Sequence, residues 1–288
     1  MLDYDVVKNW NFPELRQTYT KRDALLYALG VGLGADPLDR GQLRYVYEND
    51  MRVMPSMASV LASPGGWISH PSTGVDYLKL VHGEQDVRLH APLPAEGEVI
   101  SRSHISRVVD KGSGKGAVVE QTREIHSSGG AHLASIRQII FCRGDGGFSQ
   151  ASGRSDSSPE VLPGVPDGEP EQELTLDAAP NSALVYRLSG DWNPLHADPD
   201  VAKRAGFKAP ILHGLCTHGM AAHALLKLFC DYDAARVRRV AARLSSPVYP
   251  GESVSFQFWS LAPGTLRFRA VVKAREVVVL NNGAAELC

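Results

Sequence analysis

Two copies of one short pattern stand about half a chain apart, and this repeat restricts the possible folds more than any other feature. Arg-Leu-x-x-Pro begins at Arg88 and is followed by Gly97-Glu98, and the same pattern begins at Arg243 and is followed by Gly251-Glu252. A long strand-like run follows both copies. Internal similarity at half the chain length indicates duplication of one unit. The 288 residues leave room for two such units of about 100–150 residues each.

Each half is predicted to contain four successive strands. Turn signals and alternating apolar residues place them at residues 84–90, 99–110, 117–126, 131–143, 236–244, 253–261, 266–273 and 276–281. Shorter strands are predicted at residues 43–48 and 183–187, and a run with few breakers and good helix formers predicts a helix over residues 214–229. A sheet of this kind must bury one face, and wrapping it around a long helix is the simple solution. An α+β fold class is therefore predicted.

A segment near the middle of the chain separates the two predicted units. Residues 145–171 are rich in Gly, Ser, Asp and Pro and show almost no apolar periodicity. Such a composition is typical of a linker. The predicted organisation is an N-terminal unit over residues 1–145, a linker over 146–172 and a C-terminal unit over 173–288.

The second unit contains a short stretch with the groups of an acid–base site. Asp191, Asn193 and His196 supply an acid, an amide and an imidazole within one turn-rich segment. Gly190 allows a sharp bend before them. Downstream, Gly214 is predicted to begin the long helix, where free N–H groups and the helix dipole favour negative charge. A plain Asx turn with a solvated histidine would explain a single Asp-x-Asn-Pro equally well.

The whole string is far more specific than any of its parts. Ser-Gly-Asp-x-Asn-Pro-Leu-His, residues 189–196, resembles the hydratase 2 signature of the MaoC-like (R)-specific enoyl-CoA hydratases, and residues 210–217 are similar to that family too. Strings at residues 27–32, 80–85 and 110–114 extend the resemblance into the first half. It implies a double hot-dog fold, in which each of two tandem units is an antiparallel sheet wrapped around a helix. The corresponding region of the first half, residues 23–29, has no His and no Asn-Pro, so the first unit is predicted to be non-catalytic. The resemblance, which is to units like the hydratase 2 unit of peroxisomal multifunctional enzymes, implies that the first unit binds the acyl chain.

The resemblance implies reversible addition of water to a trans-2-enoyl-CoA, giving a (3R)-3-hydroxyacyl-CoA, in the β-oxidation of fatty or related acyl groups. Asp191 and His196 would hold the water and transfer the protons, and either could take the proton from water. Asn193 would fix the dyad or the water. The N–H of Gly214 would receive the negative charge that develops on the thioester oxygen. No metal and no cofactor are expected, because CoA is part of the substrate.

Contacts to the substrate are expected on the same basis. The residues are His82, Gly83, Lys111, Trp192, Pro194, Leu195 and Leu244. Lys111 also has a physical rationale, because a lysine in a turn can reach the phosphates of CoA. Leu244 stands where a relative would present a phenylalanine, which bears on the preferred chain length.

Two other functions remain as alternatives, an acyl-CoA thioesterase and a non-catalytic acyl-CoA-binding protein. The formal net charge of −2 gives no global field for nucleic acid or for a membrane surface. No apolar run reaches the ~18 residues of a membrane span. The four cysteines are far apart and indicate free thiols in a reducing compartment. We expect a cytoplasmic homodimer, or a peroxisomal one in a eukaryote, although the C-terminus is not of the Ser-Lys-Leu type.

Overall fold

The computed structural model describes residues 1–288, except for the side chains of residues 151 and 152. The first unit contributes strands β1 (Leu15–Tyr19), β2 (Leu80–Leu89), β3 (Gly97–Asp110), β4 (Ala117–Ser127) and β5 (His132–Cys142). The second contributes β6 (Gln172–Asp177), β7 (Val237–Leu244), β8 (Ser253–Ala262), β9 (Thr265–Val272) and β10 (Val277–Leu287). The eight long strands predicted from the sequence are confirmed, with shifts of a few residues at their ends.

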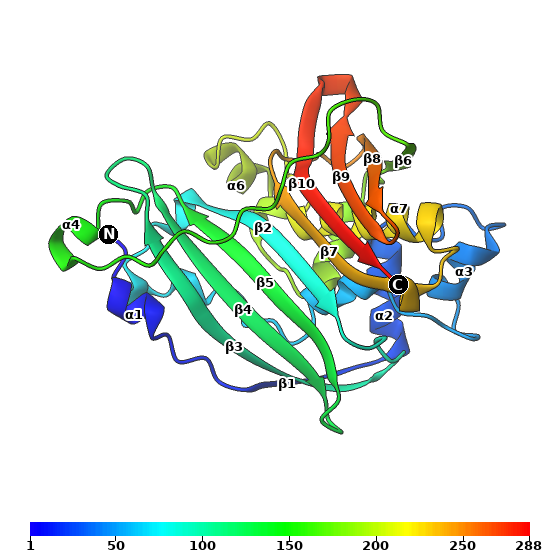
Figure 1. Cartoon of the computed structure of the whole chain (residues 1–288), viewed down its shortest axis with the longest axis horizontal. Coiled ribbons are helices and arrows are strands. Elements are labelled where there is room, and N and C mark those ends of the chain that lie inside the picture. Colours follow the sequence, from blue (N-terminus) through cyan, green and yellow to red (C-terminus); the bar gives the residue numbers. More distant parts are fainter.

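All ten strands belong to one sheet in the order β1-β3-β4-β5-β2-β7-β10-β9-β8-β6 (Figure 1). The two units meet edge to edge, because β2 pairs antiparallel with β7 from Glu84↔Arg243 to Arg88↔Arg239. Each unit repeats the same local order, with its short first strand at the outer edge, β1 beside β3 and β6 beside β8. The duplication predicted from the repeated Arg-Leu-x-x-Pro pattern is thus visible in the topology, and joining the sheets leaves fewer unpaired edges.

The helices are short except one. They are α1 (Tyr4–Lys8), α2 (Lys21–Gly30), α3 (Arg40–Val46), α4 (Ser149–Ser152), α5 (Ser182–Tyr186), α6 (Pro199–Arg204) and α7 (Gly214–Phe229). Eight short 3-10 helices, η1–η8, complete the described structure, at Pro55–Ser59, Trp67–Ser69, Pro71–Thr73, Tyr77–Lys79, Arg187–Ser189, Pro194–His196, Ala234–Arg236 and Lys273–Arg275. None of the described helices combines the length and the apolar character needed to cross a bilayer.

Two strand predictions were wrong. Residues 43–48 mostly belong to α3, whose start is fixed by the Asp39 carboxylate accepting the N–H groups of Gly41 and Gln42. Residues 183–187 mostly belong to α5, in which Ala183 and Tyr186 lie three apart and are both buried. Periodicity alone cannot distinguish a short buried helix from a short buried strand. The strand that starts the second unit is β6 instead.

Helix α7 spans residues 214–229 as predicted and lies at the centre of the molecule. Its residues from Cys216 to Leu226 are all buried. A Cβ on Gly219 would stand 2.5 Å from Val31 Cγ1, so only glycine permits this approach to the end of α2. The Cys216 thiol donates to the Gly30 carbonyl over 3.2 Å. The central helix of the second unit is therefore packed directly against the first unit.

The first unit has no long helix at the corresponding place before its first long strand. The buried five-residue 3-10 helix η1 packs there on β2, β5 and α7. Its neighbourhood contains the buried side chains of Met54, Met57 and Leu61. The two units therefore share a sheet topology but differ in what fills the concave side of the sheet.

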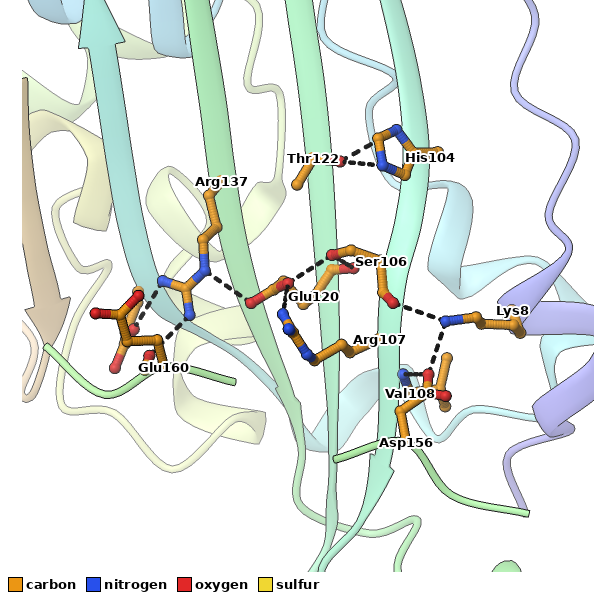
Figure 2. A network of polar contacts seen from close by, with 11 residues as sticks. Lys8, His104, Ser106, Arg107, Val108, Glu120, Thr122, Arg137, Asp156 and Glu160 are labelled. Carbon is orange, nitrogen blue, oxygen red and sulfur yellow. Dashed lines mark hydrogen bonds and ion pairs between the residues drawn. The ribbon is translucent and has the colours of Figure 1, made fainter. Parts of the chain in front are cut away.

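The segment between the units crosses the outer face of the sheet, from α4 to β6 (Figure 1). The Asp156 carboxylate accepts hydrogen bonds from the Lys8 ammonium and the Val108 N–H, each over 2.8 Å (Figure 2). Arg137 of β5 donates to the Glu160 carbonyl. Leu162 is buried against two alanines of the second unit. The predicted linker is thus attached to both units.

A buried carboxylate on β4 lies beside this segment. The Glu120 side chain is 3% exposed and accepts from Arg107 and Arg137 at 2.6 and 2.7 Å and from the Ser106 hydroxyl (Figure 2). Two cations and a hydroxyl satisfy a carboxylate that would otherwise be costly to bury. This network lies on the face of the sheet opposite the helices, so we assign it to stability.

Candidate active site

The stretch from Arg187 to His196 forms a tight loop that ends in a 3-10 helix. Gly190 has φ of +118°, in the region that favours glycine, and it ends η5. The Asp191 carboxylate accepts the N–H of Asn193 over 3.1 Å, which is an Asx turn. The Asn193 side-chain oxygen then accepts the N–H of Leu195 and caps η6. The local hydrogen bonds fix the backbone of the loop and leave Asp191 half-buried.

His196 is buried at the end of η6, and one of its ring nitrogens is committed to the backbone. Its Nδ1 lies 2.8 Å from the Ile211 carbonyl. A carbonyl can only accept, so Nδ1 carries the proton and Nε2 keeps its lone pair in the neutral ring. Burial lowers the pKa of His196 below its ordinary value, opposed by the bond to Ile211 and by the charge of Asp191. The imidazole is thus a neutral base at pH 7.

His213 completes the group. Its ring stacks on that of His196 with centroids 3.7 Å apart, and its Nε2 donates to the Asp191 carbonyl over 3.2 Å. Burial, and then the neighbouring His196, lower the pKa of His213 to about 4. One polar side-chain atom from each of Asp191, His196 and His213 lies within 4.8 Å of the others. The loop and the start of α7 therefore place one carboxylate and two neutral imidazoles together.

Gly214 is the first residue of α7, so its N–H has no partner within the helix. The Leu244 side chain lies directly over it, because a Cβ built on Gly214 would stand 2.0 Å from Leu244 Cδ2. Leu244 is the last residue of β7. The N–H of the helix start and the end of a central strand thus meet beside His213.

His82 belongs to the part of the first unit that borders the site, because Glu84, two residues on, pairs with Arg243 next to Leu244. A β-bulge between His82 and Glu84 interrupts the pairing with β5. Gly83 lies within this bulge, and a Cβ added to it would stand 3.3 Å from the carbonyl oxygen of Ile139. Bulges re-aim side chains next to active sites. The pKa of His82 is lowered to about 4, first by burial, and the Asp191 carboxylate is close enough to act on its charge. The site is therefore assembled across the two units.

The other residues expected to bind substrate surround this group less closely. Trp192 is exposed, and the Arg187 guanidinium lies 5.0 Å from its ring centroid. Pro194 is exposed and Leu195 half-buried. Lys111 is exposed in the turn after β3. It lies at the same end of the sheet as His82, because Asp110 pairs with Ala117 and both Ala117 and Leu80 pair with Cys142.

Two members of the group were not identified from the sequence. His213 stands directly before Gly214 and appeared to be only part of a loop-to-helix junction. Tyr186 is buried, its hydroxyl has no partner among the described side chains, and its ring lies 5.0 Å from that of His213. His213 lies within the family-like string of residues 210–217, which could have indicated it, and Tyr186 lies three residues before the motif that starts at Ser189.

Comparison with known families gives a match in each half of the chain. The MFE-2 hydratase 2 N-terminal domain family matches residues 17–144, and the MaoC like domain family matches residues 162–282. The chain is 40% identical to 3-hydroxyacyl-thioester dehydratase Y of Mycobacterium tuberculosis, over 93% of this chain and 92% of that protein. It is 36% identical to the peroxisomal enoyl-CoA hydratase 2 of Arabidopsis thaliana, over 96% and 93% of the two chains.

Solved structures give the same result for the fold. The crystal structure of a MaoC-like dehydratase from Phytophthora capsici superposes with a TM-score of 0.84 at 32% identity, covering 100% of this chain and 99% of that chain. A Mycobacterium tuberculosis protein described as having a double hotdog fold superposes with a TM-score of 0.55 at 14% identity, a likeness of fold alone. The architecture is an α+β double hot-dog fold, as the repeat and the motif predicted.

Proposed function

The chain belongs to the MaoC-like hydratase 2 family and is a hydro-lyase of that family, and from this premise we propose that it reversibly hydrates trans-2-enoyl-CoA to (3R)-3-hydroxyacyl-CoA. The observation that carries the proposal is that polar atoms of Asp191, His196 and His213 lie within 4.8 Å of one another, with the His196 ring held by the Ile211 carbonyl and α7 starting directly after His213. We place the reaction in the oxidation of fatty or related acyl chains.

His196 is the general base of the proposed mechanism. Its Nε2 removes a proton from a water molecule as the water oxygen attacks C3 of the enoyl thioester. The Asp191 carboxylate orients this water and stabilises the imidazolium that forms. Electron density moves onto the thioester oxygen, which the N–H of Gly214 stabilises. The imidazolium then returns one proton to C2, so that water has been added and the dyad has regained its starting protonation state.

The Ile211 carbonyl and His213 prepare His196 for this task. The bond to Ile211 holds the ring in the tautomer that presents Nε2. His213 covers one face of the ring, and its own pKa of about 4 keeps it neutral at pH 7. A charged imidazolium there would oppose protonation of His196. The neutral neighbour therefore permits proton transfer without competing for the proton.

The pH dependence of turnover follows from the lowered pKa of His196. Only the neutral ring can act as the base, so kcat/KM falls when acidification protonates it. Because burial lowers this pKa below its ordinary value of 6.5, we expect full activity at pH 7 and an acid limb with an apparent pKa below 6.5. Hydration of crotonyl-CoA measured from pH 4.5 to 8 checks this. An acid limb centred above pH 7 would contradict the role of His196 as a buried base.

The first unit is proposed to bind the acyl chain. Its loop has no equivalent of the acid–base pair, since the Asp23 carboxylate accepts the N–H and hydroxyl of Thr20 at the start of α2. Where the second unit has α7, the first has only the short η1 beside the buried Met54 and Met57. Methionine side chains repack around irregular shapes at low cost. These features support a unit that has kept the fold for substrate binding.

Leu244 is proposed to set the width of the site beside Gly214, since its side chain covers that residue. Replacing it with Phe adds an aromatic ring at this point. We expect the ratio of kcat/KM between short and long enoyl-CoA to shift by about 10–200-fold at most, because this is the selectivity that one gained or lost methylene contact in a hydrophobic pocket gives. The measurement is kcat/KM for crotonyl- and decenoyl-CoA. An unchanged ratio would remove Leu244 from the pocket and leave the reaction assignment intact.

An assay that follows two signals tests the proposed reaction against the thioesterase alternative. Hydration removes the enoyl absorbance and releases no thiol, whereas thioester cleavage releases free CoA. We expect loss of absorbance without thiol for crotonyl-CoA, decenoyl-CoA or a bulky enoyl-CoA. Release of CoA at the rate of absorbance loss would favour cleavage. Binding of all three without either signal would indicate a non-catalytic acyl-CoA-binding protein.

A further inference from the structure

A second group of metal-ligating side chains lies on the first unit, away from the catalytic loop. His90, Glu124 and His132 each offer one ligand atom, and these atoms lie within 4.8 Å of one another. His132 Nε2 is 2.7 Å from a carboxylate oxygen of Glu124. The rings of His90 and His132 stack with centroids 4.0 Å apart, and the ring of His126 stacks on His132 at 4.7 Å. Three imidazoles and a carboxylate thus gather in one place.

Sheet register brings these side chains together on the outer face. Ile125 pairs with Ala134, and both are fully buried in the core. Their neighbours Glu124 and Ser135 form the next pair and point the opposite way, because side chains alternate along a strand. His90 follows directly after β2, where its N–H donates to the Leu133 carbonyl. The arrangement is therefore held by the backbone of three strands.

The group is far from the catalytic loop. His82, which belongs to the part of the first unit that borders the site, lies near the start of β2, and His90 lies just past its end. At ~3.3 Å per residue these positions are roughly 25 Å apart along the strand. Nothing in the proposed hydration uses a residue of this group. Its chemistry therefore has to be explained separately.

The polar contacts of the group resemble a site prepared for a cation. The Ser135 hydroxyl donates to the Glu124 carboxylate over 2.5 Å and thus supplies an outer hydrogen bond that fixes this oxygen. His90 Nε2 lies 2.8 Å from the same hydroxyl.

Zinc binds an imidazole in its neutral form, through a ring nitrogen that carries no proton. Two imidazoles and a carboxylate are ligands that zinc accepts, with a fourth position left for water. We propose that His90, Glu124 and His132 form a binding site for a divalent ion of the zinc class. The ion would connect the end of β2 to the β4–β5 hairpin.

The catalytic cluster of Asp191, His196 and His213 also meets the distance condition, but its ring nitrogens are arranged differently. His196 Nδ1 and His213 Nε2 are both committed to backbone carbonyls. The outer group has no such bonds to the main chain on the nitrogens that face Glu124 and Ser135. His196 Nε2 stays available as a ligand in the catalytic cluster, so the test must separate the two groups.

The experiment is calorimetric titration of the full chain, without a histidine tag, with Zn²⁺ alone at pH 7.5. We expect one Zn²⁺ site per chain, and His132→Ala should lower its Zn²⁺ affinity by more than about 100-fold. This loss exceeds the roughly 10–100-fold that is usual when only a hydrogen-bond partner of a ligand is removed. Glu124→Gln, which keeps the shape of the side chain, should weaken binding in the same direction. Added Zn²⁺ should raise the Tm of the unaltered chain and not that of His132→Ala.

Two matched controls make the result specific. His104→Ala removes an exposed histidine on the neighbouring strand β3 whose ring contacts only Thr122 among the described polar partners. This variant should bind Zn²⁺ as the unaltered chain does. His213→Ala should also retain binding. The proposal is overturned if the unaltered chain binds no Zn²⁺, if His132→Ala and Glu124→Gln bind as tightly as it does, or if His213→Ala abolishes binding instead.

Discussion

Asp191→Asn and His196→Asn should each lower kcat for enoyl-CoA hydration by about 10²–10⁴-fold, the usual worth of a positioned acid–base group. Asn at position 191 keeps the side-chain oxygen that accepts the N–H of Asn193, so the Asx turn survives and only the charge is lost. Asn at position 196 can still donate to the Ile211 carbonyl as Nδ1 does, but it has no Nε2. Both variants therefore remove a reacting group while leaving the loop in place. Measuring kcat tests the loss of activity, and circular dichroism tests whether the fold is kept.

Asp23→Asn is the matched control for Asp191→Asn. Asp23 stands in the corresponding region of the first unit, and its carboxylate bonds only to Thr20 among the described residues. We expect turnover close to that of the unaltered chain. A loss as large as that of Asp191→Asn in a folded Asp23→Asn protein would show that the first unit takes part in the chemistry. Wild-type turnover in either dyad variant would remove that residue from the mechanism.

Removing the N–H of Gly214 should produce the second large loss. Gly214 is the first residue of α7, a position where proline is tolerated because that N–H has no helical partner. The preceding His213 has φ −59° and ψ 133°, which proline permits in the residue before it. We expect Gly214→Pro to lower kcat by about 10²–10³-fold, which corresponds to ~2.7–4 kcal/mol for one oxyanion donor.

The control for this variant must account for Leu244. Any Cβ at position 214 would stand 2.0 Å from Leu244 Cδ2, so both substitutions are best compared in a Leu244→Ala background. Gly214→Ala in that background adds the Cβ and keeps the N–H, and it should retain most of the activity. Equal losses for Gly214→Ala and Gly214→Pro would indicate that crowding, and not the donor, limits turnover.

The sequence predicts the second unit well because local and long-range signals agree there. Residues 214–229 contain one glycine, Gly219, after the first residue and otherwise good helix formers, and α7 has those bounds. Residues 183–187 were wrongly predicted as a strand because a short apolar run of five residues fits a buried helix as well as a buried strand. The edge-to-edge pairing of β2 with β7 could not be predicted, since the repeat defines two units and contains no signal for how they join.

The candidate site likewise contains residues that the sequence identifies and residues that only the structure reveals. Asp191 and His196 are marked by a contiguous motif, so the sequence identifies them. His213 belongs to the group through a ring stack with His196, and His82 through the approach of the other unit. Such contacts depend on the packing of α7 and on a bulge in β2, which single residues do not reveal. Expectations for Lys111, Trp192 and Pro194 as substrate contacts stay predictions.

The stereochemistry of the product tests the central claim most directly. Incubation of trans-2-decenoyl-CoA with the full chain, followed by chiral analysis of the 3-hydroxyacyl-CoA, reports which face of the double bond receives water. The proposed assignment to (R)-specific hydration, with Asp191 and His196 delivering the water, predicts the (3R) product. Asp191→Asn and His196→Asn should lower the turnover that yields it by about 10²–10⁴-fold. A (3S) product would contradict it.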